Sequence, residues 1–184
     1  MAHVLVPLAQ GCEEIEAVTV IDLLRRAQIK VVTAGLDNKP VQASRGVVLI
    51  PDTNLDDALA VDFDMVVLPG GPGADHLDED PRIHRIVRDM ADAGKGVAAI
   101  CAAPKVLAHA GVLAGKRATC FPGAIGPEEA AAQAIDLVDR PVVRDGLVTT
   151  SRGPGTAMDF ALALIEALAG RDRRDEVEAG LVRG

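Results

Sequence analysis

Cys101 is the residue in this sequence whose surroundings most favour nucleophilic chemistry. It stands in the stretch Ala99–Pro104, where a strand-like run gives way to small residues and a proline that can open a helix. A nucleophile at such a sharp turn is the arrangement of a nucleophile elbow, here built around a thiol. Because a helix N-terminus favours thiolate over thiol, we expect the pKa of Cys101 to be lowered. The alternative is a small buried hydrophobe, as most isolated cysteines are.

A glycine pair stands at the end of another apolar run and could serve such a thiol. Gly70 and Gly71 belong to the stretch Pro69–Gly73, which reads Pro-Gly-Gly-Pro-Gly. Glycines let the backbone approach a ligand closely and present N–H groups to an oxyanion. A tight turn is the alternative, and the spacing is not that of a dinucleotide-binding fingerprint.

Three glutamates, Glu13, Glu14 and Glu16, open a predicted helix, where the helix dipole favours carboxylates. A solvated helix start explains two of them. Glu16 lies between Ile15 and Ala17, which we expect to face inward, and could stay protonated by burial and donate a hydrogen bond to a thiolate. The residues alone do not identify which glutamate does so.

The elements that must position these groups alternate between short β-branched runs and longer amphipathic stretches. The predicted strands are 3–8, 29–34, 41–43, 47–50, 64–68, 97–100, 142–143 and 147–150. The predicted helices are 14–27, 81–93, one after Cys101, 155–168 and 171–181, with a looser Ala-rich segment at 127–134.

The central strands predict where the chemistry lies. Residues 4–8, 65–68 and 97–100 are apolar nearly throughout, as in a parallel sheet covered on both faces. We therefore predict a doubly wound α/β fold with a mostly parallel sheet between helices, and one domain over residues 1–184. Ligands of such sheets bind beyond the carboxyl ends of the strands, so the three segments are expected to converge on one crevice.

Composition excludes several classes of function. The net charge is −8, and the chain has no Trp or Tyr, which opposes charge-driven nucleic-acid binding and base stacking. Cys12, Cys101 and Cys120 form no C-x-x-C pair, so we expect no disulfide framework, no metal site and a reducing cytoplasm. No apolar run reaches the roughly 20 residues that span a bilayer, and we expect no membrane association.

Four motifs in order give the sequence a specific resemblance. Glu-Glu-Ile-Glu-Ala-Val near the start, Leu-Pro-Gly-Gly, Ala-Ala-Ile-Cys-Ala-Ala-Pro and Thr-Ser-Arg-Gly-Pro-Gly-Thr resemble the ThiJ/PfpI superfamily, most closely its protein deglycase branch. The resemblance covers Val4 to about Gly170. It implies a flavodoxin-like homodimer without a cofactor.

The same resemblance implies roles for individual residues. Cys101 would be the reactive nucleophile and Glu16 its protonated carboxyl partner. The oxyanion site would be bordered by Gly70, Gly71 and Ala102, and the dimer-side rim of the pocket would carry Glu13, Arg26 and Arg45.

Members of this superfamily are described as converting methylglyoxal and glyoxal to hydroxy acids, and as removing their adducts from proteins and nucleotides. We therefore expect a small aldehyde or a glycated molecule as substrate. A redox-sensing chaperone whose cysteine is oxidised to sulfinate is the alternative.

A cysteine hydrolase or protease is the third alternative. Protease-type relatives place His directly after the nucleophile, where this chain has Ala102. The animal branch has a His near the pocket where this chain has Phe121, so Glu16 is left as the acid/base candidate. Of the four histidines, we expect His84 and His109 on helix surfaces and only His76 near the crevice.

Overall fold

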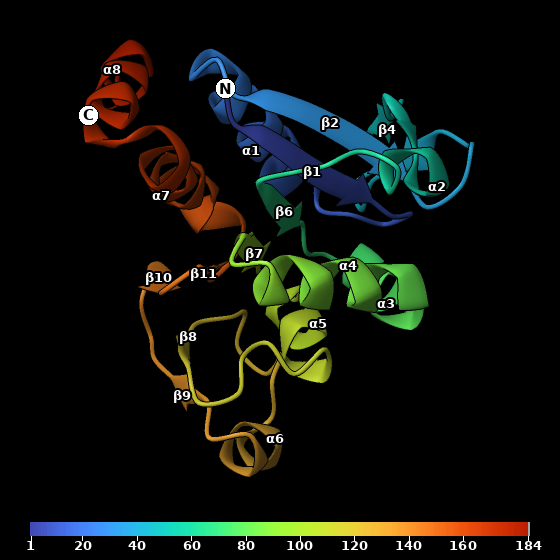
Figure 1. The fold of residues 1–184 in the computed structure, drawn as a ribbon, viewed down its shortest axis with the longest axis vertical. Coiled ribbons are helices and arrows are strands. Elements are labelled where there is room, and N and C mark those ends of the chain that lie inside the picture. The colour runs from blue at the N-terminus through green and yellow to red at the C-terminus, as the bar shows by residue number, and fades with distance from the viewer. Residues whose placement is uncertain (184) are drawn as a thin grey trace.

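A seven-stranded sheet forms the centre of the molecule (Figure 1). The computed structural model describes residues 1–183, and it orders the strands β10-β11-β7-β6-β1-β2-β5. All neighbouring strands are parallel except β10 and β11. The strands are β1 (His3–Leu8), β2 (Lys30–Gly35), β5 (Thr53–Asn54), β6 (Met65–Leu68), β7 (Gly96–Ile100), β10 (Val142–Asp145) and β11 (Val148–Ser151).

Helices cover both faces of this sheet. One face carries α1 (Glu14–Arg26), α7 (Ala157–Ala169) and α8 (Arg171–Gly180). The other carries α2 (Leu55–Ala58), α3 (Gly73–Glu79), α4 (Pro81–Asp92) and α5 (Pro104–His109). These helices leave the carboxyl edge of the sheet free to hold a site.

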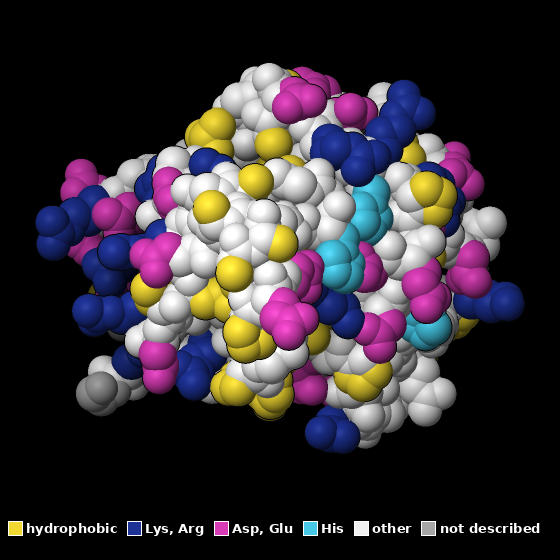
Figure 2. Space-filling model, turned by 90° about the horizontal axis from the view of Figure 1, so that it is seen from below, with side chains coloured by type: hydrophobic (Ala, Val, Ile, Leu, Met, Phe, Trp, Pro, Cys, Tyr) yellow, Lys and Arg dark blue, Asp and Glu magenta, His cyan; other side chains and the backbone are white. Residues whose placement is uncertain are grey.

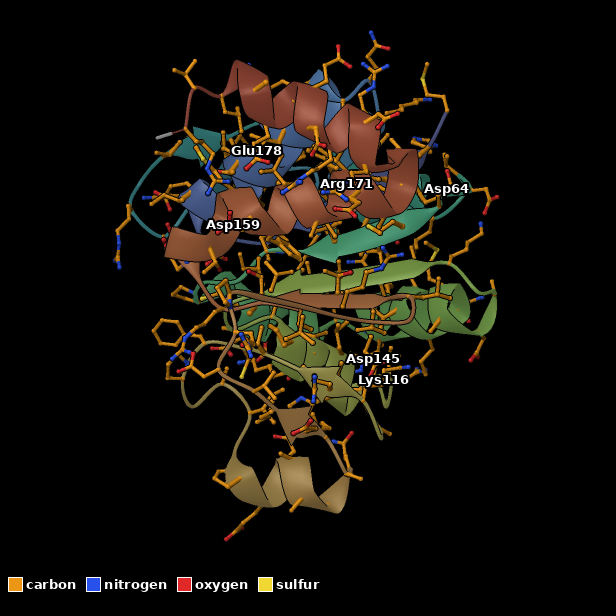
Figure 3. The ribbon with its side chains drawn as sticks, turned by 90° about the vertical axis from the view of Figure 1, so that its left-hand side faces the viewer. Asp64, Lys116, Asp145, Asp159, Arg171 and Glu178 are labelled. Carbon is orange, nitrogen blue, oxygen red and sulfur yellow. The ribbon has the colours of Figure 1, made fainter. Side chains whose placement is uncertain are left out.

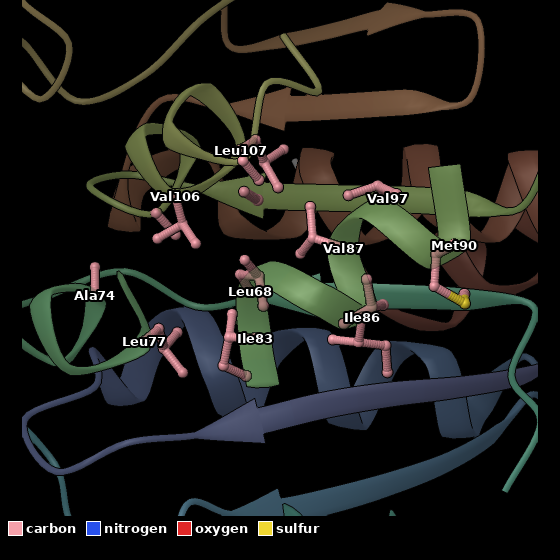
Figure 4. Packing of buried hydrophobic residues seen from close by; sticks show 14 of the residues in the cluster. Leu68, Ala74, Leu77, Ile83, Ile86, Val87, Met90, Val97, Val106 and Leu107 are labelled. Carbon is pink, nitrogen blue, oxygen red and sulfur yellow. The ribbon is translucent and has the colours of Figure 1, made fainter. Parts of the chain in front are cut away.

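The strands supply both cores because their side chains alternate between the two faces. On β1, Leu5 packs with the core under α4 and α5, while Val4 and Val6 pack with the core under α1 and α7. Figure 4 shows the first core, in which Ile83 and Val87 of α4 point toward the sheet. The sheet is thus buried on both faces, as its apolar strands predict.

Several smaller elements lie outside the seven-stranded sheet and its helix layers. They are the hairpin β3 (Val41–Gln42) and β4 (Val48–Leu49), the pair β8 (Arg117–Ala118) and β9 (Asp136–Leu137), α6 (Pro127–Ala132) and the 3-10 turn η1 (Pro154–Thr156). The segment with β8, α6 and β9 extends away from the layers (Figures 1 and 3). Figure 3 also labels Asp159 on α7 and Glu178 on α8, both of which form ion pairs with Arg183.

The doubly wound α/β fold is confirmed, with the order β2-β1-β6-β7-β11 expected of a flavodoxin-like sheet. The direction of winding reverses at β1, which lies between β2 and β6. Short elements were not predicted, including α3 and the strands β5, β8 and β9. The Ala-rich segment forms α6, and the helix predicted from residue 155 begins at Ala157 after η1.

Candidate active site

Cys101 occupies the turn between β7 and α5 with an unusual backbone conformation. Its φ is +64°, a left-handed value that is uncommon for a residue with a side chain. Two hydrogen bonds hold it: the Cys101 N–H donates to the Ser151 carbonyl at 3.0 Å, and the Cys101 carbonyl accepts from the Phe121 N–H at 2.8 Å. The residue is 7% exposed. This turn is the elbow that the sequence predicts.

Glu16 lies in the first turn of α1 and is completely buried. Its Oε2 accepts a hydrogen bond from the Gly70 N–H at 2.8 Å, and no well-formed hydrogen bond reaches its Oε1 from residues 1–183. Burial raises the pKa of Glu16 to about 7, against the lowering effect of the Gly70 and Cys101 hydrogen bonds. The carboxyl therefore keeps its proton up to about pH 7, well above the range of an ordinary glutamate, and lies within hydrogen-bonding reach of the Cys101 thiol.

The thiol of Cys101 does not have the lowered pKa that the sequence predicts. Burial, and then the charge of Glu16, raise the pKa of Cys101 to about 12, while the N–H groups of Gly71 and Ala102 lower it. The prediction is wrong because α5 begins only at Pro104 and its N-terminus is outweighed by desolvation and a neighbouring carboxylate. A proton on Glu16 removes the negative charge that raises the pKa of Cys101. The ionisation of each group therefore depends on the other, and the two titrate as a pair.

The glycines allow the three segments to meet. A Cβ on Gly70 would lie 2.6 Å from the Cys101 Cβ and 2.7 Å from the Ile100 carbonyl oxygen. Gly71 has a φ of +75°, and a Cβ there would lie 2.7 Å from the Glu13 nitrogen. Since the Gly70 N–H is bound to Glu16, the amides that act on the sulfur are those of Gly71 and Ala102.

The remaining predicted rim residues lie around the start of α1 and its hairpin. Glu13 is buried and caps α1, and its Oε2 accepts from the Ser44 hydroxyl at 2.8 Å. Arg26 is exposed and pairs with Asp22 one helical turn away, and Arg45 is exposed on the hairpin. Ile15 was expected to face inward, but it is 54% exposed. The rim roles of Glu13, Arg26 and Arg45 stay predictions.

The other two cysteines lie in different environments from Cys101. Cys12 is buried, and burial together with the charges of Glu14 and Glu13 raises its pKa to about 11. Burial also raises the pKa of Cys120, which is partly exposed. Neither effect involves Glu16 as a hydrogen-bond partner, which distinguishes both residues from Cys101.

The histidines lie away from this turn. His84 and His109 both bind Asp78, with Nε2 of His84 3.0 Å from Oδ1 and Nδ1 of His109 2.7 Å from Oδ2. His84 is therefore half-buried, contrary to the expected surface position. His76 lines a hollow of about 560 Å³ that Cys101 does not line. Histidine side chains lie beside acidic ones on the face shown in Figure 2.

Within residues 1–183, no cluster of three or more His, Cys, Asp or Glu side chains is placed to bind a metal ion. In the same range no helix is long and apolar enough to cross a bilayer.

Comparison with known proteins gives consistent matches over nearly the whole chain. Protein dj-1beta of Drosophila melanogaster is 44% identical over 180 residues, covering 97% of this chain and 95% of that protein. The glutathione-independent glyoxalase DJR-1.2 of Caenorhabditis elegans is 35% identical over 176 residues, covering 96% and 92%.

Solved structures agree with the sequence matches. The crystal structure of Drosophila melanogaster DJ-1beta has a TM-score of 0.93 at 43% identity, covering 100% of this chain and 98% of that one. An oxidised DJ-1 of Toxoplasma gondii also has a TM-score of 0.93, at 34% identity and full coverage of both chains. The model of the DJ-1/PfpI family matches residues 2–167, and with relatives this similar over this length, the chain belongs to that family.

Proposed function

We propose that this protein is a cofactor-independent glyoxalase or deglycase, in which Cys101 is the nucleophile and Glu16 the acid/base. The observation that carries the proposal is the buried carboxyl of Glu16, placed by the Gly70 N–H and coupled to the Cys101 thiol. The glyoxalase name of the worm relative supports the same chemistry. A 2-oxoaldehyde such as methylglyoxal, free or as an adduct, is the proposed substrate.

The reaction follows from these groups without an external oxidant. The Cys101 proton passes through the Glu16 carboxylate to the aldehyde oxygen while the sulfur bonds to the aldehyde carbon, giving a neutral hemithioacetal whose oxygen faces the N–H groups of Gly71 and Ala102. Glu16, again a carboxylate, takes the hydrogen of that carbon as a proton and returns it to the neighbouring carbon, while the hemithioacetal hydroxyl proton moves to the former ketone oxygen, so that the neighbouring carbon becomes the alcohol carbon. The resulting thioester is hydrolysed by water, releasing the 2-hydroxy acid and the Cys101 thiol.

The reaction needs no external oxidant or reductant, because the aldehyde carbon is oxidised and the ketone carbon is reduced within one substrate molecule. One water enters and none of the protein groups changes its redox state. A deglycase reaction would use the same steps on a hemithioacetal or hemiaminal adduct, with the amine or thiol of the glycated residue as leaving group.

Substitution of the three cysteines tests the proposal. Cys101→Ser is expected to abolish conversion of methylglyoxal to lactate, because the hydroxyl is far less nucleophilic than a thiol beside this carboxyl. Cys12→Ser and Cys120→Ser serve as matched controls and are expected to keep most of the activity. Retained activity in the Cys101 variant would refute the mechanism.

We also infer a homodimer in the cytoplasm. Apolar side chains are exposed near the start of α1 and on its neighbouring hairpin, among them Ile15 (54%), Val48 (61%) and Ile50 (83%). A second copy of the chain would cover them, since isologous dimers are the commonest oligomers. The free thiols of the three cysteines suit a reducing compartment.

A redox-sensing role, with chaperone activity, is a second candidate that one observation favours. The similar Toxoplasma gondii structure is an oxidised form. In this chain the N–H groups of Gly71 and Ala102 and the Glu16 proton could hold the oxygens of a Cys101 sulfinate. The turnover number measured at intracellular aldehyde concentrations separates this role from the enzymatic one.

A further inference from the structure

The Ser151 hydroxyl at the end of β11 and the Thr156 hydroxyl in η1 form a pair behind the Cys101 turn. Ser151 is completely buried, and its Oγ lies 2.7 Å from the Thr156 Oγ1 and donates to the Pro141 carbonyl at 2.7 Å. Thr156 Oγ1 also accepts from the Gly153 N–H at 3.1 Å. The pair thus joins the last residue of β11, the start of β10 and the turn before α7.

The backbone of Ser151 connects this pair to the nucleophile through one hydrogen bond. The Ser151 carbonyl accepts the Cys101 N–H, and Ser151 pairs with Ile100 across β11 and β7. The Cys101 carbonyl is held from the other side by the Phe121 N–H. Segment 119–121 is in turn fixed to β11, because the buried Thr150 Oγ1 accepts the Thr119 N–H at 2.9 Å. Both polar groups of the Cys101 peptide unit therefore depend on the end of β11.

The backbone of Cys101 needs such support. A non-glycine residue with a φ of +64° relaxes unless its surroundings hold it. If the turn relaxes, the sulfur moves relative to the N–H groups of Gly71 and Ala102 and to the Glu16 carboxyl. A displacement of this kind costs reaction rate without removing any group that touches the substrate.

We propose that Ser151, together with Thr156, is a positioning residue for Cys101. Its hydroxyl fixes the end of β11, whose carbonyl holds the Cys101 N–H and thereby the direction of the thiol. The role in turnover rests on the proposed function, whereas the role in holding the thiol does not. The hydroxyls of Thr150, Ser151 and Thr156 take no part in the proposed bond-forming and proton-transfer steps.

Removing the Ser151 hydroxyl is a clean perturbation because it leaves no buried polar group without a partner. The Pro141 carbonyl still accepts from the Arg152 N–H at 3.2 Å. The Thr156 hydroxyl still exchanges hydrogen bonds with the Gly153 backbone. We therefore expect Ser151→Ala to fold, and the rate effects to report on position.

The test measures the second-order rate of Cys101 alkylation by iodoacetamide, followed by peptide mass spectrometry, in a Cys12→Ser/Cys120→Ser background. Ser151→Ala and Thr156→Val are each expected to slow alkylation about tenfold. Thr156→Ser keeps the hydroxyl and is expected to restore the rate to within about twofold of the parent. The double variant is expected to slow alkylation by much less than a hundredfold, because both changes remove the same contact.

Thr33→Val is the matched control. Thr33 is a buried hydroxyl residue on β2, bonded to Asp52 and separated from β7 by two strands. It is expected to lower the melting temperature without changing alkylation of Cys101. In the aldehyde assay, Ser151→Ala should reduce kcat about tenfold and leave KM within about twofold.

The outcomes separate the two proposals. Unchanged alkylation in both Ser151→Ala and Thr156→Val would overturn the positioning role, as would equal slowing by Thr33→Val or by Thr156→Ser. If Cys101→Ser retains aldehyde conversion, the proposed function fails while the alkylation rates still decide the positioning role.

Discussion

Replacing Glu16 by Gln should remove a specific dependence of stability on pH. Burial raises the pKa of Glu16 to about 7 from its ordinary value of 4.5. Between these two pH values the folded protein keeps a proton that the unfolded chain has released. The free energy of unfolding therefore falls as the pH rises from about 4.5 to about 7, and this contribution is level above pH 7.

The size of the effect follows from the difference between the two pKa values. The step from 4.5 to about 7 corresponds to about 3 kcal/mol, at about 1.4 kcal/mol for each pH unit. Gln mimics the protonated carboxyl: its carbonyl accepts the Gly70 N–H, and its NH2 group takes the place of the proton. Glu16→Gln should therefore not show this fall in the free energy of unfolding as the pH rises.

Urea unfolding of each protein at pH 5 and at pH 8 gives the change in its free energy of unfolding between the two pH values. The effect is the difference between these changes for the wild type and for Glu16→Gln. Between these two pH values, the wild-type protein should lose about 2–3 kcal/mol more than Glu16→Gln. Glu128 is an exposed glutamate on α6, and Glu128→Gln should behave as wild type. Equal pH dependence in wild type and Glu16→Gln would show that the carboxyl is not held in its neutral form, and would remove the basis for its acid/base role.

Three further outcomes are expected. Gly70→Ala should lower stability by about 1–3 kcal/mol and slow alkylation of Cys101, because its Cβ meets backbone and side-chain atoms closer than 3.0 Å, whereas Gly126→Ala, which meets nothing within 4 Å, should be neutral in thermal melts. Mild peroxide should oxidise Cys101 before Cys12, because the N–H groups of Gly71 and Ala102 and the Glu16 proton can hold the added oxygens, and mass spectrometry showing oxygen first on Cys12 would contradict the assigned thiol. Ile50→Lys should convert the inferred dimer to a monomer in light scattering, and a monomeric wild type at micromolar concentration would refute the interface.

The central strands and the elbow were predictable because each depends on local pattern. Apolar runs of four to six residues read directly as β1, β6 and β7, and small residues around Cys101 allow a sharp turn. The pairing of Glu16 with Cys101 entered through the family resemblance, since three neighbouring glutamates look alike in sequence. What distinguishes Glu16 is its complete burial against Gly70, a contact across 54 positions.

Features that depend on distant contacts were missed or misjudged. The predicted fall in the pKa of Cys101 considered the helix start and not the desolvation that outweighs it. The hydroxyls of Thr150 and Ser151 resemble any polar residues at the end of a strand, and nothing local marks them as partners of segments 119–121 and 141. The strands β8 and β9 are two residues each and are defined by their pairing with each other, so they carry no pattern of their own.

The hydrogen bond between Cys101 and Ser151 also bears on how the protein is made. Fifty positions separate the two residues, and the Phe121 N–H lies twenty positions beyond Cys101. A chain emerging from the ribosome therefore presents Cys101 long before the strand that fixes its turn exists, and parallel pairings over such separations form late in folding. The Cys101 N–H acquires its partner only when β11 joins the sheet. During synthesis the nascent chain thus carries an ordinary cysteine, and the proposed reactivity toward aldehydes requires the completed fold.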